Sequence, residues 1–201
     1  MSEPKTLVPV SAQDFRSTLR CFPTGITVVT TVLEGRRKGF TANAFSSVSV
    51  EPPMVLICVN RQSRTHPLIA EAGSFCINIL RLEQRGVAIR FASRTADDPF
   101  DKLDCRSGAT GSPIIADSLA YLDCMLAEEH TAGTHTIFLG SVVACGSAAG
   151  SAAGGSAAGS GAGGSATGGS AACGEGLVVT VLTLGRGRAD LRAVSLSRLS
   201  W

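Results

Sequence analysis

A series of short apolar runs rich in β-branched residues limits the folds open to this chain. Strands are predicted over residues 26–33, 39–50, 54–59, 75–80, 120–127 and 136–144. Short helices are predicted over residues 11–22, 65–72 and 82–91. Because few long helices separate the strands, the pattern favours a mainly β (α+β), antiparallel barrel or sandwich with helices at its ends over a doubly wound sheet.

Small polar side chains gather in the strand expected over residues 39–50. Its apolar residues recur with a period of about two, which indicates a buried face, and Thr41, Asn43 and Ser49 occupy the other register. Such a polar row suits a ligand that bonds to small side chains and backbone N–H groups. On this stretch alone, an edge strand whose hydroxyls face water is the simpler explanation.

The length and charge of the chain argue against several classes of function. The chain has 201 residues, of which 44% are hydrophobic and 17% charged, as in a globular domain with a sizeable core. Its net charge of +2 gives no reason to expect a nucleic-acid or membrane partner. We find no signal-peptide pattern at the N-terminus and no apolar run long enough to span a membrane.

Seven cysteines are scattered along the chain without a CxxC pair, so neither a zinc site nor a dithiol redox motif is indicated. Cys58 and Cys76 lie inside apolar runs, where a free cysteine behaves as a small hydrophobic residue. This pattern predicts a reducing, cytoplasmic location and no metal site.

The composition changes abruptly after residue 145. From Gly146 to Ala172 every residue is Gly, Ser or Ala except Thr167, which predicts a flexible linker or insertion. We therefore divide the chain into a domain at 1–145, a low-complexity segment at 146–173 and a tail at 174–201. The tail has a strand candidate at 177–184 and a weakly helical end, and we expect it to return to the barrel as the last strand. An engineered or frame-disturbed origin of the segment is the alternative.

Several sequence segments, taken in order, resemble the flavin reductase family, the small reductase components of two-component flavin monooxygenases. They are Phe22-Pro23-Thr24-Gly25-Ile26, the stretches 39–49, 52–59 and 75–80, and Gly133-Thr134-His135-Thr136-Ile137-Phe138-Leu139-Gly140. Each segment is a weak signal by itself. Their order and spacing together make the resemblance specific over residues 15–143.

The resemblance implies an antiparallel, Greek-key-like split β-barrel with short helices at the barrel ends, assembled as a homodimer. It also implies NAD(P)H:flavin oxidoreductase activity, with NADH or NADPH reducing FMN or FAD. Reduced flavin would then pass by diffusion to a partner flavin-dependent monooxygenase. Hydride transfer between two cofactors needs no protein nucleophile and no metal, because the cofactors carry the reactive atoms. The protein must hold the two rings face to face and exclude water.

The resemblance also implies the residues of the site. His135 is the catalytic candidate, placed to hydrogen-bond a cofactor near the stacked rings. The flavin would lie along residues 41–49 and its phosphate side against the loop 60–65. The implied cofactor-binding residues are Thr24, Gly25, Thr41, Ala42, Asn43, Ala44, Ser46, Ser47, Val48, Ser49, Asn60, Arg61, Ser63, Thr65, Asn78, Phe91 and Gly133.

Some of these residues also have purely structural explanations. The three serines at 46, 47 and 49 cannot all face one side of a strand, and Ala44 suits barrel packing. Asn78, if buried, would be satisfied equally by flavin or by neighbouring backbone. Arg61 is also explained as a solvated loop charge, and His66 as packing at a helix start.

Thr134 stands where the family usually has Asp in a Gly-Asp-His signature. A threonine can orient His135 only through a weaker, neutral hydrogen bond, so nicotinamide preference and loop order are in question more than the fold. Two other functions stay open. One is a non-catalytic carrier or sensor that binds flavin or haem in a split barrel, and the other is a structural β-domain that tethers a partner.

Overall fold

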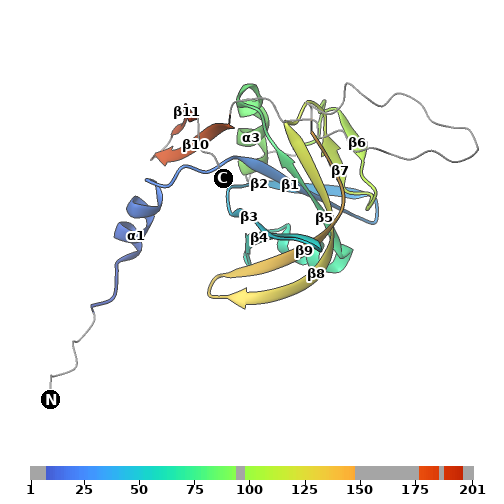
Figure 1. Ribbon diagram of the computed structural model, residues 1–201, viewed down its shortest axis with the longest axis horizontal. Coiled ribbons are helices and arrows are strands. Elements are labelled where there is room, and N and C mark those ends of the chain that lie inside the picture. The colour runs from blue at the N-terminus through green and yellow to red at the C-terminus, as the bar shows by residue number, and fades with distance from the viewer. Residues whose placement is uncertain (1–7, 94–97, 148–176, 186–187, 197–201) are drawn as a thin grey trace, which may run out of the picture.

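Antiparallel strands form most of the protein. The computed structural model describes residues 8–93, 98–147, 177–185 and 188–196. Within them a seven-stranded antiparallel sheet has the order β2-β1-β5-β8-β9-β4-β3 (Figure 1). Its strands are β1 (Thr27–Leu33), β2 (Arg36–Ala42), β3 (Phe45–Val50), β4 (Pro53–Asn60), β5 (Ser74–Ile79), β8 (Ala120–Ala132) and β9 (His135–Ser147).

The order of the strands makes this sheet curl into a barrel. β2 and β3 lie at opposite edges of the sheet, yet only Asn43 and Ala44 separate them in the chain. Three residue steps span at most about 11 Å, so the two edges must come close together. The mainly β, antiparallel architecture predicted from the sequence is confirmed.

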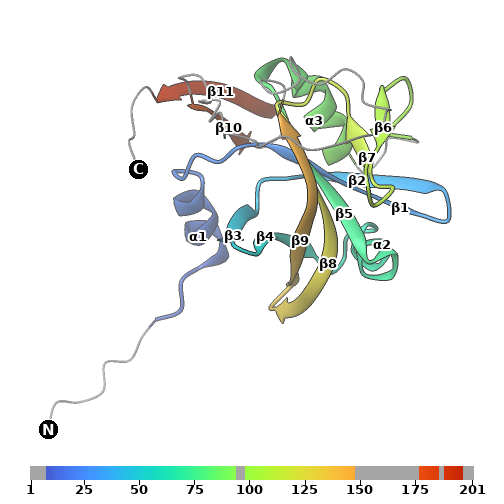
Figure 2. The ribbon, with the colours of Figure 1, turned by 45° about the vertical axis from the view of Figure 1, so that its right-hand side comes forward.

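Short helices and two small sheets accompany the barrel. The helices are α1 (Ala12–Leu19), α2 (His66–Ala72) and α3 (Arg85–Ala92), and the 3₁₀ turn η1 (Leu82–Gln84) precedes α3. β6 (Cys105–Ser107) pairs with β7 (Pro113–Ile115), and β10 (Leu177–Gly185) pairs with β11 (Arg188–Leu196). Figure 1 shows α1 standing apart from the barrel, and Figure 2 shows that it lies on the side of β3.

The helix ends follow the capping residues in the sequence. The Ser11 hydroxyl accepts the backbone N–H of Asp14 at 3.1 Å, which satisfies one of the unpaired donors at the start of α1. Gly73 ends α2 with φ of +63° and donates its N–H to Ile69. These features confirm the N-terminal cap predicted for the first helix and the glycine end predicted for the second.

Alternating side chains build the barrel core. Val55, Ile57 and Val59 of β4 face inward with Phe138 of β9, and all four are buried. A Cβ on Gly140 would lie 2.6 Å from the Phe75 ring, so β9 has glycine where this ring crosses it. A second cluster packs α3 against β1 and β7. Its buried members are Ile26, Val28, Leu80, Ala88, Phe91, Phe100 and Ile115.

The structure differs from the sequence-based expectations in four places. The strand expected at 39–50 is interrupted at Asn43–Ala44, and the connection expected at 128–135 is mostly strand, because a two-residue turn joins β8 to β9. That turn has Gly133 at φ of +59°, which suits a tight hairpin. The three-residue strands β6 and β7 were not predicted.

The C-terminal tail is the fourth difference. Its end forms strand β11, so the weak helix predicted there is wrong. β10 and β11 pair with each other rather than with the seven-stranded sheet, which differs from the expected return of a last barrel strand. Gly146 and Ser147 belong to β9, and the rest of the predicted linker lies outside the described residues.

Candidate functional site

Three segments far apart in the sequence meet where β4 ends. The Asn43–Ala44 corner joins β4 through the Ala44 carbonyl, which accepts the N–H of Cys58 at 3.0 Å. Asn60, the last residue of β4, lies opposite His135 in the β4–β9 pairing. We call the residues 43–44, 60–65 and 133–135 the corner site.

The tight turn between β8 and β9 holds His135 in a defined direction. Arg61 donates its backbone N–H to the Thr134 carbonyl at 3.0 Å, so the turn is tied to the loop after β4. The Thr134 hydroxyl lies 2.9 Å from Nδ1 of the His135 ring. His135 is half-buried. The neutral hydroxyl partner that we expected for this histidine is therefore present, and it leaves Nε2 as the outer ring nitrogen.

The strand segment expected to seat a ligand is largely open to solvent. Its exposed residues are Asn43, Ala44, Ser46, Ser47 and Val48. Ser49 is half-buried, and the pairing register shifts between Ser47 and Ser49, so the serines do not simply alternate. Thr41 is also half-buried, and its hydroxyl donates to the Ala88 carbonyl at 2.6 Å. Thr41 thus fixes α3 to β2, a role that the sequence did not reveal.

The loop after β4 is ordered by its own side chains. The Asn60 side-chain oxygen accepts the N–H of Gln62 at 2.8 Å, and the Ser63 hydroxyl accepts the N–H of Thr65 at 3.2 Å. Thr65 is buried at the start of α2, whereas Arg61 is exposed. The loop therefore presents a cation and polar groups on a backbone that is already folded.

The side chains of three predicted site residues face the core. Asn78 is fully buried, donates its amide to the Val28 carbonyl at 3.1 Å and accepts the N–H of Ile115 at 2.8 Å. Phe91 packs edge-on against Phe100 with 4.9 Å between ring centroids, and Ala42 is buried in the barrel. We therefore correct the candidate site by removing these three side chains, whose packing and hydrogen bonds are satisfied within the protein.

The remaining predicted residues, Thr24 and Gly25, connect α1 to β1. Gly25 is exposed, and a Cβ added to it would meet no atom within 4 Å. Packing within the described chain therefore does not require glycine at this position. His66, by contrast, packs as expected, because its Nε2 lies 2.7 Å from the Thr136 hydroxyl and its ring contacts Phe138.

Cys58 is a neighbour of the site that the sequence reading did not include. Its backbone binds Ala44, its side chain is half-buried, and burial raises the pKa of its thiol. A neutral thiol at this position adds no charge beside the corner. The polar groups that are available to a cofactor here are instead the Asn43 amide, the nearby serines, Arg61 and the His135 ring, and such a set fits the polar edge and phosphate of a flavin.

Comparisons with known proteins identify the family of this chain. The family model of the flavin reductase like domain matches residues 19–155. A reductase subunit of a flavin-dependent monooxygenase, HsaB of Mycobacterium tuberculosis, is 43% identical over 133 residues, which cover 66% of this chain and 71% of the relative. A flavin reductase (NADH) of Kitasatospora aureofaciens is 40% identical over 151 residues, covering 73% of this chain and 78% of the relative.

A solved structure with the same fold is the NADH:FAD oxidoreductase SgcE6 of Streptomyces globisporus. It has 37% sequence identity and a TM-score of 0.65, over 72% of this chain and 88% of that one. The chain belongs to the flavin reductase family. The predicted family, the split-barrel fold, and the flavin reductase class with its flavin and nicotinamide cofactors are therefore confirmed. Among the described helices, none has both the length and the apolar character needed to cross a membrane.

Proposed function

We propose that this chain reduces flavin with NADH at the corner site and supplies the reduced flavin to a separate monooxygenase. The observation that carries this proposal is the meeting of three segments at the end of β4: the Asn43–Ala44 corner, the loop 60–65 and the turn that holds His135. Relatives described as NADH-dependent support NADH, and those described as FAD reductases favour FAD over FMN.

The chain contributes binding and orientation. When bound, the nicotinamide supplies a hydride and the flavin accepts it. The exposed Asn43 amide can bond the polar edge of the flavin ring, and the small Ala44 side chain lets a flat ring approach the backbone. His135, held at Nδ1 by Thr134, directs Nε2 toward the bound rings and shields that side from water.

The loop after β4 holds the charged end of the flavin. Ser46 and Ser47 are exposed on β3, Arg61 is exposed on the loop, and Ser63 is half-buried beside it. Hydroxyl groups and a guanidinium suit a phosphate, because both donate hydrogen bonds and the guanidinium adds charge. The open, solvent-facing side of these residues fits a flavin that enters and leaves as a substrate.

Three finer points belong to the same proposal. A partner monooxygenase receives the reduced flavin by diffusion, as the description of HsaB as a reductase subunit supports. The protein is a homodimer, because β4 and β9 carry an outer face of half-buried apolar residues that a second copy can cover. It works in the cytoplasm, a location supported by the free cysteines among the described residues.

Anaerobic mixing of the protein with NADH and excess FAD or FMN tests the activity. We expect flavin to accelerate NADH oxidation many-fold, with FAD the better acceptor. No acceleration with either flavin and either nicotinamide would reject the proposal. Tightly bound flavin that survives gel filtration without NADH oxidation would instead support the carrier function.

An Asn43→Ala variant tests the position of the flavin. Loss of one hydrogen bond should weaken flavin binding about 3- to 10-fold in a fluorescence titration. Gln13→Ala removes an exposed amide on α1 and serves as the control, with unchanged affinity expected. Equal affinity of Asn43→Ala and the unaltered protein would place the flavin elsewhere.

A further inference from the structure

The loop after β4 is attached at its first residues to the β8–β9 turn and to the start of β9. Asn60 lies opposite His135 in the β4–β9 pairing, and Arg61 donates its backbone N–H to the Thr134 carbonyl at 3.0 Å. These contacts act on the first two residues of the loop. They do not by themselves place the residues that follow, so the far end of the loop needs an attachment of its own.

His66, the first residue of α2, supplies that second attachment. Its Nε2 lies 2.7 Å from the Thr136 hydroxyl of β9, and its ring contacts Phe138 with 5.3 Å between ring centroids. Thr136 is only 4% exposed, so bulk water does not readily replace the imidazole as the partner of this hydroxyl. His66 also donates its backbone N–H to the Ser63 carbonyl at 3.2 Å, which connects the attachment directly to the loop.

Both ends of the loop are therefore held by three consecutive residues, 134–136. Between the two attachments lie the exposed Arg61 and the half-buried Ser63, which are proposed above to bind the flavin phosphate. A phosphate is bound best by donors whose separation is already set, because less freedom is then lost on binding. Packing of the His66 ring on Phe138 does not require a hydrogen bond to a buried hydroxyl, so this bond calls for a further explanation.

We propose that His66 is a positioning residue, which sets the phosphate-binding shape of the loop through its hydrogen bond to Thr136. The bond holds the start of α2, and with it the far end of the loop, at a fixed distance from the turn that carries His135. Arg61 and Ser63 are thereby kept available to the same phosphate. The inference rests on the proposed function, because it concerns the phosphate of the flavin that binds at the corner site.

Fluorescence titration with FMN and with riboflavin tests this role, because the two ligands differ only by the phosphate group. His66→Phe keeps an aromatic ring but removes the hydrogen bond. We expect it to weaken FMN binding about 3- to 10-fold, and riboflavin binding less than about twofold. His66→Gln has an amide nitrogen in place of Nε2 and should restore most of the FMN affinity. Equal weakening for the two ligands, or none for FMN, would overturn the inference.

Thr136→Val removes the other partner of the same bond with little change in the size of the side chain. It should weaken FMN binding as much as His66→Phe does, and the double variant should bind no more weakly than either single variant. Losses that add in the double variant would show that the two side chains act separately, which contradicts the proposal.

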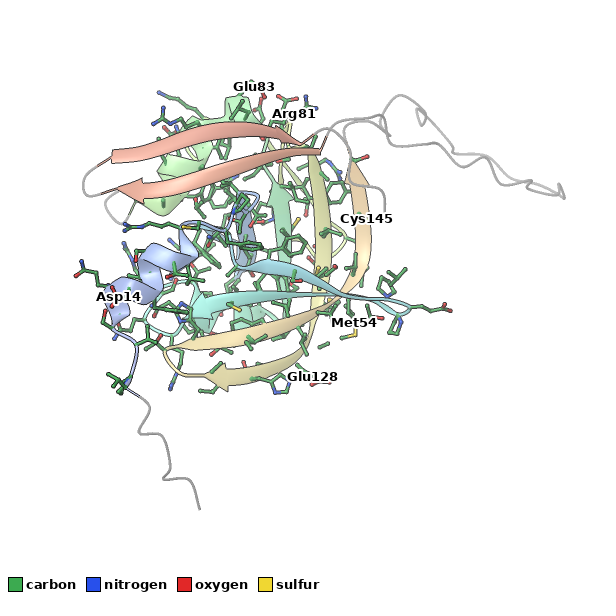
Figure 3. The ribbon with its side chains drawn as sticks, turned by 60° about the vertical axis from the view of Figure 1, so that its left-hand side comes forward. Asp14, Met54, Arg81, Glu83, Glu128 and Cys145 are labelled. Carbon is green, nitrogen blue, oxygen red and sulfur yellow. The ribbon has the colours of Figure 1, made fainter. Side chains whose placement is uncertain are left out.

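His130→Phe is the matched control, because it makes the same change at an exposed histidine of β8. The Nε2 of His130 lies 3.0 Å from the carboxylate of Glu128, and Figure 3 shows Glu128 at the outer margin of the barrel. Both flavin affinities should stay unchanged in this variant. Circular dichroism checks that each variant is folded. The titration contains no NADH, so it tests the role of His66 even if the protein does not oxidise NADH.

Steady-state kinetics give a second readout. His66→Phe should raise KM for FMN and leave kcat nearly unchanged, because the hydrogen bond acts on binding of the phosphate and not on hydride transfer. A lower kcat with an unchanged KM for FMN would contradict this role.

Discussion

At the scale of single residues, the contact between Thr134 and His135 sets how the candidate catalytic ring is presented. The hydroxyl lies 2.9 Å from Nδ1, on a turn that the backbone of Arg61 also holds. A neutral partner orients the ring without placing a carboxylate beside the cofactors. Thr134 is thus a positioning residue in the proposed reaction.

Removing the hydroxyl tests this role. Thr134→Val should lower kcat/KM for NADH about 3- to 10-fold, the effect of one neutral hydrogen bond, and Thr134→Ser should restore most of it. The imidazole ¹⁵N signals of His135 should change in the valine variant only. Thr131→Val alters an exposed threonine on the same hairpin and should leave both readouts unchanged. A fully active Thr134→Val enzyme with unchanged signals would remove Thr134 from the site.

Buried thiols should make the folded protein less stable at alkaline pH. Burial, with the nearby Asp123 and Cys145, raises the pKa of the Cys124 thiol from an ordinary 9.0 to about 12. Burial and Asp123 also raise the pKa of Cys76 strongly. In the unfolded chain these thiols lose their protons near pH 9, while the folded protein retains them. The contribution of these thiols to the free energy of unfolding is therefore fully present below pH 9, and it is lost as the pH rises toward 12.

The expected loss is about 1.4 kcal/mol per pH unit for each such thiol. Urea unfolding at pH 8, 9 and 10 measures it. Cys124→Ala should reduce the slope of the free energy of unfolding against pH by the share of one thiol, because one of the two buried thiols is removed. A free energy of unfolding with the same pH dependence in this variant would show that Cys124 has no part in the effect.

At the scale of the elements, the sequence predicted the regular strands well, because alternating apolar residues and turn residues leave a local signal. It could not predict the interruption at Asn43–Ala44, since small and polar residues continue the alternation through the corner. β6 and β7 have three residues each and are too short for a recognisable period. The end of the tail was read as weakly helical, whereas cross-strand pairing with β10 makes it a strand.

The candidate site was predictable only in part for a related reason. Order along the chain pointed to Asn43, the loop 60–65 and His135, and the structure brings these together. Asn78 was misplaced because a strand pattern does not tell which partner satisfies a buried amide. The structure gives that partner as the backbone of β1 and β7.

Gly140 shows how closely these strands pack. An alanine Cβ there would lie 2.6 Å from Cζ of Phe75 and 2.9 Å from Cβ of Cys124, so Gly140→Ala should destabilise the protein by about 1–3 kcal/mol. Gly86→Ala on α3 is the control, because no atom lies within 4 Å and helix propensity favours alanine. Thermal unfolding of both variants checks the difference. A melting temperature for Gly140→Ala at or above that of Gly86→Ala would contradict the packing described here.

At the scale of the whole molecule, the corner site lies where the barrel closes. The outermost strands of the sheet, β2 and β3, are covalently joined through Asn43 and Ala44. Pairing between these strands does not hold the junction, so its order depends on neighbours such as the Ala44 contact to Cys58. The site proposed for the flavin is therefore also the junction at which the two edge strands of the barrel meet.

A flavin bound at this junction should stabilise the closed form of the whole barrel. Saturating flavin should slow amide hydrogen exchange in β2 and β3 more than in β5, which lies between two partners in the middle of the sheet. Mass spectrometry of exchanged peptides measures this, and uniform protection of all strands would mean that flavin stabilises the fold without acting at its junction. If β2 and β3 are protected preferentially, the closed junction of the barrel becomes more stable each time a flavin binds and less stable each time it leaves during turnover.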